Sequence, residues 1–310
     1  MIKLFGFIFF CCSQFLFCLE IDSYFKKLPE KKEDYSMGSI DCVYMINLDE
    51  RPEKFEKCVN LLMLYGIVPL RFPAVNGWEL SLEAINDLGV ECTPWIGDPR
   101  TATCYLPENN GEPHHEPMGE WGRTYFCHCM ARGSIGIVLS HLSILQDAFD
   151  SGYETIWVME DDVDLIQNPH TLSDLVDELN DCVGEDGWDI LFTDRDTKNS
   201  YGQYVPNTSY AWRPNFIPDD PGRFAARSQV GASFRTVGAR FGAYSMIVKR
   251  SGMKKLLDFI KEYHIFVPYD IDYALPPGMR LFTVLEDVVS TQPGAPSDNG
   301  GPNYLKSRSY

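Results

Sequence analysis

The chain has 310 residues and a mass of 35.3 kDa, enough for one large or two modest globular domains. Hydrophobic residues make up 45% and charged residues 23%, a composition that supports a substantial core and excludes wholesale disorder. The formal net charge of −17 would repel a phosphate backbone, which argues against nucleic-acid binding as the main function. Converging carboxylates in so acidic a chain would suit a divalent cation.

The N-terminal segment, residues 1–19, has the pattern of a signal peptide or an N-terminal anchor. Lys3 precedes an apolar run from Leu4 to Phe17, which has the length of a secretory h-region and is shorter than the ~20 residues of a membrane span. A buried N-terminal helix is the alternative. No small-residue cleavage site precedes Cys18, so an uncleaved anchor and a lipid-attachment site both stay open. We expect an exported or membrane-associated protein rather than a cytoplasmic one, with any membrane association running through this segment.

Residues 20–40 are charged and aperiodic, which indicates a linker, and a domain over residues 41–290 follows. In this domain short apolar runs alternate with amphipathic stretches. The expected strands are 42–47, 70–72, 155–159, 188–193, 243–248 and 281–285, and the expected helices are 51–64, 80–88, 134–149, 171–182 and 251–263. This alternation predicts an α/β fold around a mostly parallel central sheet. Sites in such sheets lie beyond the carboxyl ends of the strands, here after Asn47, Met159 and Thr193.

Two long irregular stretches, residues 91–132 and 195–240, interrupt the alternation and are expected to be inserts. The first contains four cysteines and three histidines, namely Cys92, Cys104, Cys127, Cys129, His114, His115 and His128. Because the leader points to an oxidising compartment, we expect disulfides to pin this stretch. A zinc site is the alternative, although the spacing lacks the paired CxxC signature. Residues 291–310 are rich in Pro, Gly and Ser and predict a loose C-terminal tail.

Four carboxylates directly follow the strand expected at 155–159, namely Glu160, Asp161, Asp162 and Asp164. Like charges brought to one point by a buried strand repel one another, and a divalent cation relieves that repulsion most simply. Oxygen donors suit Mn²⁺ or Mg²⁺ better than zinc or copper. A charged turn whose Asp side chains accept from backbone N–H groups is the alternative. Because the chain has neither a P-loop nor a Gly-x-Gly-x-x-Gly after its first strand, a nucleotide-diphosphate donor bound through metal is the remaining reading.

Short sequence blocks that follow one another in a fixed order carry a resemblance to a known family. The blocks are Ile46-Asn47-Leu48-Asp49-Glu50-Arg51, Ala74-Val75-Asn76-Gly77, Gly136-Ile137-Val138-Leu139-Ser140-His141, Val158-Met159-Glu160-Asp161-Asp162-Val163, Gly242-Ala243-Tyr244 and Pro268-Tyr269-Asp270. Over roughly residues 41–290 the chain resembles glycosyltransferase family 25, which contains lipopolysaccharide glycosyltransferases and collagen hydroxylysine galactosyltransferases. The resemblance implies a GT-A-like nucleotide-sugar-binding fold. It also implies transfer of a hexose, galactose or glucose, from a UDP-sugar donor to a hydroxyl of a glycan or protein acceptor.

The resemblance also implies roles for individual residues. In the acidic block Asp162 would bind the metal and Glu160 would lie nearer the ribose, with Asp161 beside them. Because Asp162-Val163-Asp164 is a literal Asp-x-Asp sequence, Asp164 is the alternative ligand. The other donor-site residues would be Asn47, Arg51, Asn76, Gly77, Ser140 and His141.

A catalytic base is expected near the end of the domain. Asp270 and Asp272 follow a strand-like run at 264–267, and either could take a proton from the acceptor hydroxyl; the family position favours Asp270. Several donor-site residues have purely structural alternatives. These are an exposed charge at a helix start for Arg51, a plain turn for Asn76 and Gly77, and a structural helix histidine for His141.

Two other functions stay open at this point. The export signal and the acidic surface also fit a catalytically inactive module that binds a glycan or a protein on the same fold. The same carboxylates could serve a metal-dependent hydrolase, which would normally need a second acidic cluster or nearby histidine ligands. The two inserts match no part of the family and are expected to shape the acceptor site.

Overall fold

The computed structural model describes residues 21–28, 31, 34–96, 98–199, 201–204, 212–292 and 294–307. The expected signal peptide or anchor at 1–19 lies outside these residues. In the described part of the chain, no helix combines the length and the apolar character needed to cross a membrane.

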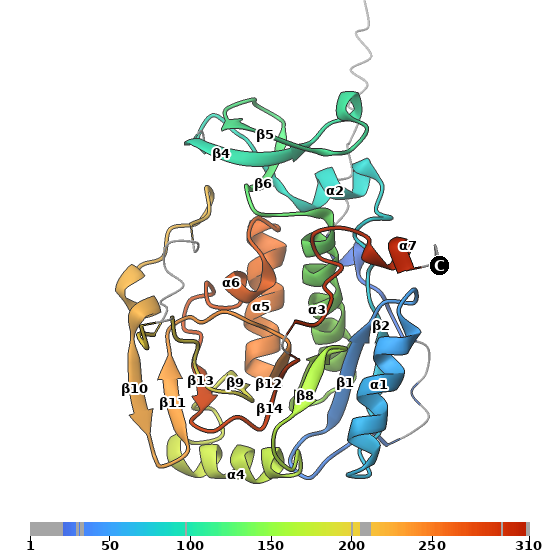
Figure 1. Cartoon of the computed structure of the whole chain (residues 1–310). Helices are drawn as coiled ribbons and strands as arrows, with labels where there is room; N and C mark the ends of the chain where they lie inside the picture. The colour runs from blue at the N-terminus through green and yellow to red at the C-terminus, as the bar shows by residue number, and fades with distance from the viewer. Residues whose placement is uncertain are drawn as a thin grey trace, which may run out of the picture.

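A mixed β-sheet, eight strands wide within the described residues, forms the centre of the molecule (Figure 1). Its strands are, from edge to edge, β10 (Arg227–Val230), β11 (Phe234–Val237), β13 (Leu281–Val284), β9 (Ile190–Phe192), β12 (Ser245–Lys249), β7 (Thr155–Glu160), β1 (Cys42–Asn47) and β2 (Leu70–Pro73). Strands β2, β1 and β7 are parallel, as are β13 and β9, while β12 runs antiparallel between β7 and β9. The predicted α/β fold is confirmed, and each expected strand is present.

Helices cover both faces of this sheet. They are α1 (Pro52–Met63), α3 (Arg132–Asp150), α4 (Thr171–Val183) and α5 (Arg250–Tyr263). Alternate residues of β1 enter two separate cores, Tyr44 and Ile46 with residues of α3 and α5, and Val43 and Met45 with residues of α1 and α4. A strand that is buried on both faces is apolar along its whole length, which is why its position could be predicted from the sequence.

The first insert is a small antiparallel sheet rather than the irregular stretch that the sequence suggested. Its strands β3 (Val90–Glu91), β6 (Thr124–Cys127), β4 (Asp98–Tyr105) and β5 (Pro113–Met118) pair in that order, next to α2 (Leu82–Leu88) and with the short helix η2 (Pro107–Asn109) in the β4–β5 connection. Figure 1 shows it above α3 and α5. Ala102, Tyr105 and Phe126 are buried in the same core as the helices, so cross-strand pairing and apolar packing order this stretch.

The disulfides expected in this insert are not formed. All seven cysteines from Cys42 onward are free, and Cys92 and Cys104 are buried as small apolar side chains. Among the described residues, no three His, Cys, Asp or Glu side chains gather in a way that could hold a metal ion, which also removes support for the zinc alternative.

The second insert contributes β10, β11 and the short helix η3 (Pro221–Ala225) to one edge of the central sheet. A separate antiparallel pair, β8 (Val163–Leu165) and β14 (Val289–Thr291), follows the acidic block. The remaining short helices are η1 (Ile21–Tyr24), α6 (Tyr269–Asp272) and α7 (Asn303–Ser307).

The described ends of the chain pack against the domain. In the segment expected to be a linker, Ile21 and Phe25 are buried, and Lys26 Nζ donates to the carbonyl of Ala74 at 2.6 Å. In the segment expected to be a loose tail, Tyr304 of α7 is buried and its hydroxyl accepts from Asn76 Nδ2 at 2.9 Å. Both expectations are corrected by these contacts, because a few buried apolar side chains anchor segments whose overall composition is polar.

Candidate functional site

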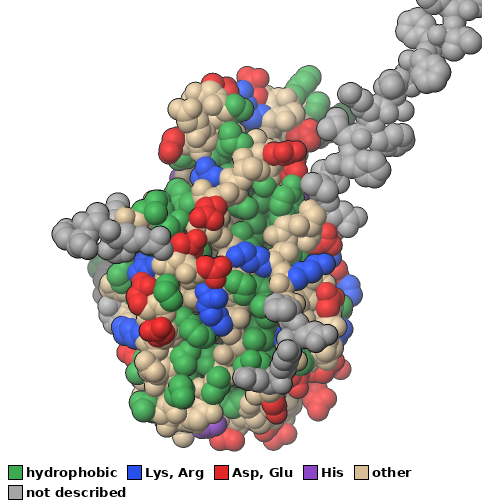
Figure 2. Space-filling model, turned by 90° about the vertical axis from the view of Figure 1, so that its right-hand side faces the viewer, with side chains coloured by type: hydrophobic (Ala, Val, Ile, Leu, Met, Phe, Trp, Pro, Cys, Tyr) green, Lys and Arg blue, Asp and Glu red, His purple; other side chains and the backbone are tan. Residues whose placement is uncertain are grey.

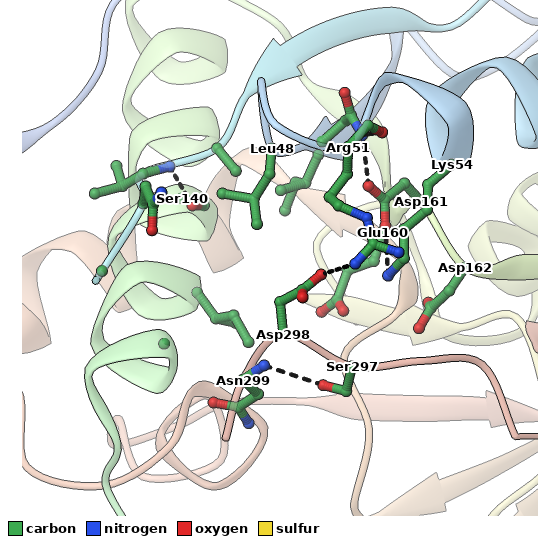
Figure 3. Close-up of a pocket in the computed structure, with 18 of the residues that line it drawn as sticks. Leu48, Arg51, Lys54, Ser140, Glu160, Asp161, Asp162, Ser297, Asp298 and Asn299 are labelled. Atoms are coloured by element: carbon green, nitrogen blue, oxygen red, sulfur yellow. Dashed lines mark hydrogen bonds and ion pairs between the residues drawn. The ribbon is translucent and has the colours of Figure 1, made fainter. Parts of the chain in front are cut away.

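A pocket lies at the carboxyl ends of β1, β2 and β7, the edge of the sheet where the topology predicts a site. Its walls come from the start of α1, the loop after β2, helix α3, the acidic block and residues 297–299 (Figure 3). Its cavity volume is about 100 Å³, which is smaller than the ~300–1,000 Å³ of typical small-ligand sites, and it is partly open to solvent.

The acidic block is divided by the structure. Glu160, Asp161 and Asp162 line the pocket, whereas Asp164 lies in β8 opposite Ser290 and is not part of the lining. Asp161 is occupied by the protein itself: its Oδ2 accepts from Asn47 Nδ2 at 2.6 Å, and its Oδ1 is 3.7 Å from Lys54 Nζ. The pocket therefore favours the register in which Asp162 would be the ligand.

One oxygen of Asp162 is distinctive. Its Oδ1 is buried and has no hydrogen-bond partner within the described residues. Burial and repulsion from Glu160 raise the pKa of Asp162 to about 6, and burial also raises the pKa of Asp161. A buried carboxylate oxygen without a donor is costly unless a cation satisfies it. The donor chemistry at this point fits a hard divalent ion.

The raised pKa of Asp162 makes a prediction about the metal-free protein. A carboxyl whose pKa is higher in the folded than in the unfolded protein stabilises the fold at pH values below its ordinary pKa of 3.8. This stabilisation is lost as the pH rises through about 6. We expect Asp162→Asn to raise the melting temperature at pH 7 in the presence of EDTA and to leave it nearly unchanged at pH 4. Asp164→Asn is the control. An equal effect of Asp162→Asn at both pH values would contradict the prediction.

Asn47 positions other residues of the site rather than facing a ligand. It is buried, its Nδ2 donates to the carbonyl of Arg51 and to Asp161, and its Oδ1 accepts from Arg71 Nε at 2.8 Å. Arg51 and Lys54, both at the start of α1, supply positive charge to the pocket lining. Lys54 was not predicted from the sequence, although it lies one helical turn after Arg51 and so on the same face.

The loop after β2 is held against α3 by contacts that require small residues. Ser140 Oγ accepts from the N–H of Val75 at 2.8 Å and donates to the carbonyl of Gly136 at 2.7 Å. A Cβ on Gly77 would come within 1.9 Å of the carbonyl oxygen of Arg132. Asn76 accepts from the N–H of Trp78 at 3.1 Å. These contacts hold Asn76, Gly77 and Ser140 in the pocket wall.

His141 links the pocket to the segment that carries Asp270. Its Nε2 is 3.2 Å from Glu160 Oε1, and its ring stacks on Tyr269 with centroids 4.1 Å apart. Asp270 Oδ2 accepts from the N–H of Gly242 at 3.2 Å. Burial raises the pKa of Asp270, and repulsion from Glu160 acts in the same direction. Asp270 is not part of the pocket lining, but it follows Tyr269, whose ring stacks on His141 of that lining.

Asp272 has a structural environment instead. It is fully buried, and its two carboxylate oxygens accept from Arg213 Nε at 2.9 Å and Arg213 Nη2 at 2.6 Å. Arg213 also donates to the backbone carbonyls of Tyr263 and His264. A carboxylate saturated in this way does not reach a bound substrate. Of the two predicted bases, the geometry leaves Asp270.

The C-terminal strap, defined here as residues 294–307, closes one side of the pocket, and no local signal in the sequence identified it. Asp298 accepts from Arg51 Nη1 through its carboxylate, and its backbone carbonyl accepts from Trp78 Nε1 at 3.0 Å. Ser134 Oγ donates to Asn299 Oδ1 at 2.6 Å. Figure 3 shows Asp298 directed at Arg51 from the strap. These partners are up to 247 residues apart in the sequence, so only folding brings them together.

The Arg51–Asp298 pair makes the strap testable. Both side chains are about nine-tenths buried, and a hydrogen bond to a charged group contributes about 1.5–3 kcal/mol. We expect Asp298→Asn to accelerate amide hydrogen exchange across the strap by about tenfold or more. Glu53 also pairs with Arg51 but is 62% exposed, so Glu53→Gln is the matched control and should leave the exchange unchanged. Equal exchange in the Asp298 variant and the wild type would contradict the strap's dependence on Arg51.

Charges of both signs gather around this side of the molecule. Figure 2 shows acidic and basic side chains close together in the middle of the face, between apolar patches. Within the lining itself, Glu160, Asp161, Asp162 and Asp298 outnumber Arg51 and Lys54, and both cations already contact carboxylates. An anionic ligand would therefore bind here more favourably together with an added cation.

Comparison with known proteins gives a consistent result. The family model described as "Glycosyltransferase family 25 (LPS biosynthesis protein)" matches residues 41–274. A "Glycosyltransferase 25 family member" of Drosophila melanogaster is 31% identical over 172 residues, 56% of this chain and 24% of that protein. An "Inactive glycosyltransferase 25 family member 3" of Homo sapiens is 28% identical, over 55% of this chain and 24% of that protein. A "Procollagen galactosyltransferase 1" of Danio rerio is 25% identical, over 57% and 24%. The chain thus aligns with about a quarter of the length of these relatives.

Proposed function

Because the chain belongs to glycosyltransferase family 25, we propose that it transfers a hexose, galactose or glucose, from a UDP-sugar to a hydroxyl of a glycan or protein acceptor. Mn²⁺ or Mg²⁺ is the proposed cofactor. The observation that carries the proposal is the buried Oδ1 of Asp162, which has no hydrogen-bond partner in the described part of the chain and lies in a pocket that also contains Arg51 and Lys54. An unsatisfied carboxylate beside two cationic side chains fits a site that binds a cation and a polyanion together.

The residues that would hold the metal are Asp162 first and Glu160 second, since Asp161 is engaged by Asn47 and Lys54. One or two carboxylates are what a hard cation of this type needs from the protein when phosphate oxygens and water complete its shell. When bound, the metal would neutralise negative charge on the departing diphosphate.

The chain's own groups would orient the donor. Arg51 can form a two-pronged hydrogen bond to a phosphate, and Lys54 adds a point charge one turn further along α1. Both lie at the N-terminus of a twelve-residue helix, the end whose dipole favours anions. Arg51 donates a hydrogen bond to the carboxylate of Asp298, and a phosphate would have to replace this carboxylate or share Arg51 with it.

Asp270 is the proposed base that receives the proton of the acceptor hydroxyl. Its raised pKa moves it toward the range where a carboxylate can accept a proton near neutral pH. The two inserts contact each other and the segment that precedes Asp270. The guanidinium of Arg100 in β4 lies 3.2 Å from the ring centre of Trp212, which packs against Phe266. We expect these inserts to shape the acceptor site. The acidic composition and the leader expected from the sequence would suit an acceptor in the secretory pathway or the cell envelope.

The proposal is tested by donor turnover. Purified full-length protein with Mn²⁺ is incubated with a panel of UDP-sugars, with and without candidate glycan acceptors, and UDP release is measured. We expect one UDP-hexose to be turned over and EDTA to stop the reaction. A folded protein that neither turns over nor binds any sugar nucleotide would overturn the proposal.

A second function is favoured by one comparison. The human relative is named an inactive glycosyltransferase, so membership of family 25 does not by itself guarantee transferase activity. In that case this chain would be a glycan- or protein-binding module on the same fold. Isothermal titration calorimetry separates the two, because an enzyme binds UDP in a metal-dependent way and a pure binding module does not bind it.

A further inference from the structure

Two cysteines lie side by side at the turn that leads from the first insert into α3. Cys127 ends β6 and is half-buried, Cys129 is exposed, and their Sγ atoms are 2.8 Å apart. The other described cysteines differ from this pair. Cys42, Cys58, Cys92 and Cys104 are buried, and Cys182 is exposed in α4.

The turn is held from both sides, so the contact between the sulfurs follows from its backbone. The N–H of Cys127 donates to the carbonyl of Phe266 at 2.8 Å, and its carbonyl accepts from Thr103 Oγ1 at 3.1 Å and from the N–H of Met130 at 3.0 Å. The sulfurs are closer than two unbonded sulfur atoms normally approach. The two sulfur atoms of a disulfide are ~2.05 Å apart, so the pair is already near bonding distance.

The two thiols are also unequal. The two thiols share a hydrogen bond, which lowers the pKa of Cys129 and raises that of Cys127. The charge of Asp270 opposes the ionisation of Cys129 and so places this sulfur within electrostatic reach of the predicted base. Cys129 is thus both the more exposed and the more readily ionised thiol, the combination that determines which cysteine reacts first.

We propose that Cys127 and Cys129 form a reversible disulfide and are a redox-modification site of this protein. The oxidant would be a small-molecule disulfide such as oxidised glutathione. The Cys129 thiolate attacks one of its sulfurs, forms a mixed disulfide and releases one glutathione thiolate. Cys127 then gives up its proton and attacks the Cys129 sulfur, which releases the second glutathione. Two protein thiols become one disulfide while one glutathione disulfide becomes two thiols.

The bond should be labile rather than permanent. A disulfide between residues two apart closes a small, strained ring, and this one would be exposed to solvent. Strained or exposed disulfides have less negative reduction potentials and exchange readily with the glutathione pool. The turn also anchors Phe266, four residues before Asp270, so the modification lies next to the segment that carries that residue. The proposal stands on these contacts and does not depend on transferase activity.

The test is a redox titration of the purified full-length protein. Samples are equilibrated at a series of reduced-to-oxidised glutathione ratios, quenched with acid, alkylated with N-ethylmaleimide and analysed by peptide mass spectrometry. We expect the peptide with both cysteines to lose two hydrogens in oxidising buffer and to regain them, as two alkylated thiols, in reducing buffer. Cys182, an exposed cysteine with no thiol contact to another described cysteine, should yield only the alkylated form or a glutathione adduct in the same samples.

Variants make the result decisive. Cys129→Ser should abolish the internal bond, and Cys182→Ser should leave it unchanged. Because Cys129 is exposed, its replacement by serine is not expected to disturb folding, which a circular dichroism spectrum checks. The proposal is overturned if both thiols stay alkylated at the most oxidising ratio, if Cys129 stops at the mixed disulfide, or if Cys127 pairs with another cysteine.

Discussion

Asp162→Asn is expected to lower the rate of sugar transfer by about 100- to 1000-fold. The proposed metal would contribute several kcal/mol to the transition state as a Lewis acid, and each ~1.4 kcal/mol corresponds to a factor of ten. Asparagine keeps the shape of the side chain but removes the charge that a divalent cation requires at the buried Oδ1. The measurement is UDP release at saturating Mn²⁺, together with the Mn²⁺ concentration that gives half-maximal rate.

Asp164→Asn is the matched control for this prediction. It is the same change two residues away, at a position in β8 that is not part of the pocket lining. We expect it to retain most of the activity and the wild-type response to Mn²⁺. If Asp164→Asn were the damaging change and Asp162→Asn were tolerated, the ligand assignment would be reversed. Unfolding curves of both variants exclude a loss of fold as the explanation.

Asp270→Asn is expected to lose catalytic activity, whereas Asp272→Asn is expected to lose stability. A positioned base contributes about 10²- to 10⁴-fold to the rate, so Asp270→Asn should lose activity while keeping its fold. Asp272→Asn leaves the buried guanidinium of Arg213 without its counter-charge, and breaking a buried pair costs about 3–5 kcal/mol of stability. The measurements are kcat from UDP release and the free energy of unfolding from urea titration.

A double variant tests the second half of this prediction. Replacing both partners by apolar residues, as in Arg213→Met with Asp272→Leu, removes the uncompensated charge and should recover much of the lost stability. If the Asp272→Asn variant were inactive but as stable as the wild type, the structural role assigned to Asp272 would be contradicted. This result would also return that residue to the list of candidate bases.

The acidic block illustrates how far sequence reasoning reached. An apolar strand followed by clustered carboxylates predicted a site at the end of β7, and the structure contains a pocket there. The sequence left two readings of the Asp-x-Asp register open. The structure places the two candidate ligands differently. Strand β8 begins at Val163, so Asp164 lies opposite Ser290 and away from the pocket, whereas Asp162 lines it. Whether the site binds metal and UDP-sugar stays a prediction.

The amino-acid sequence by itself determined the α/β fold, the strands and helices of the central layer, the sheet edge that carries the site and the family. These features depend on local apolar periodicity and on contiguous motifs, which a linear reading detects. Only the tertiary structure decided the antiparallel sheet of the first insert and the strap's contact with Arg51. It also decided the contrast between Asp270 and Asp272 and the approach of Cys127 to Cys129. Such features depend on which distant groups share a buried space, and hydrogen bonding and desolvation are resolved only once the chain has folded around them.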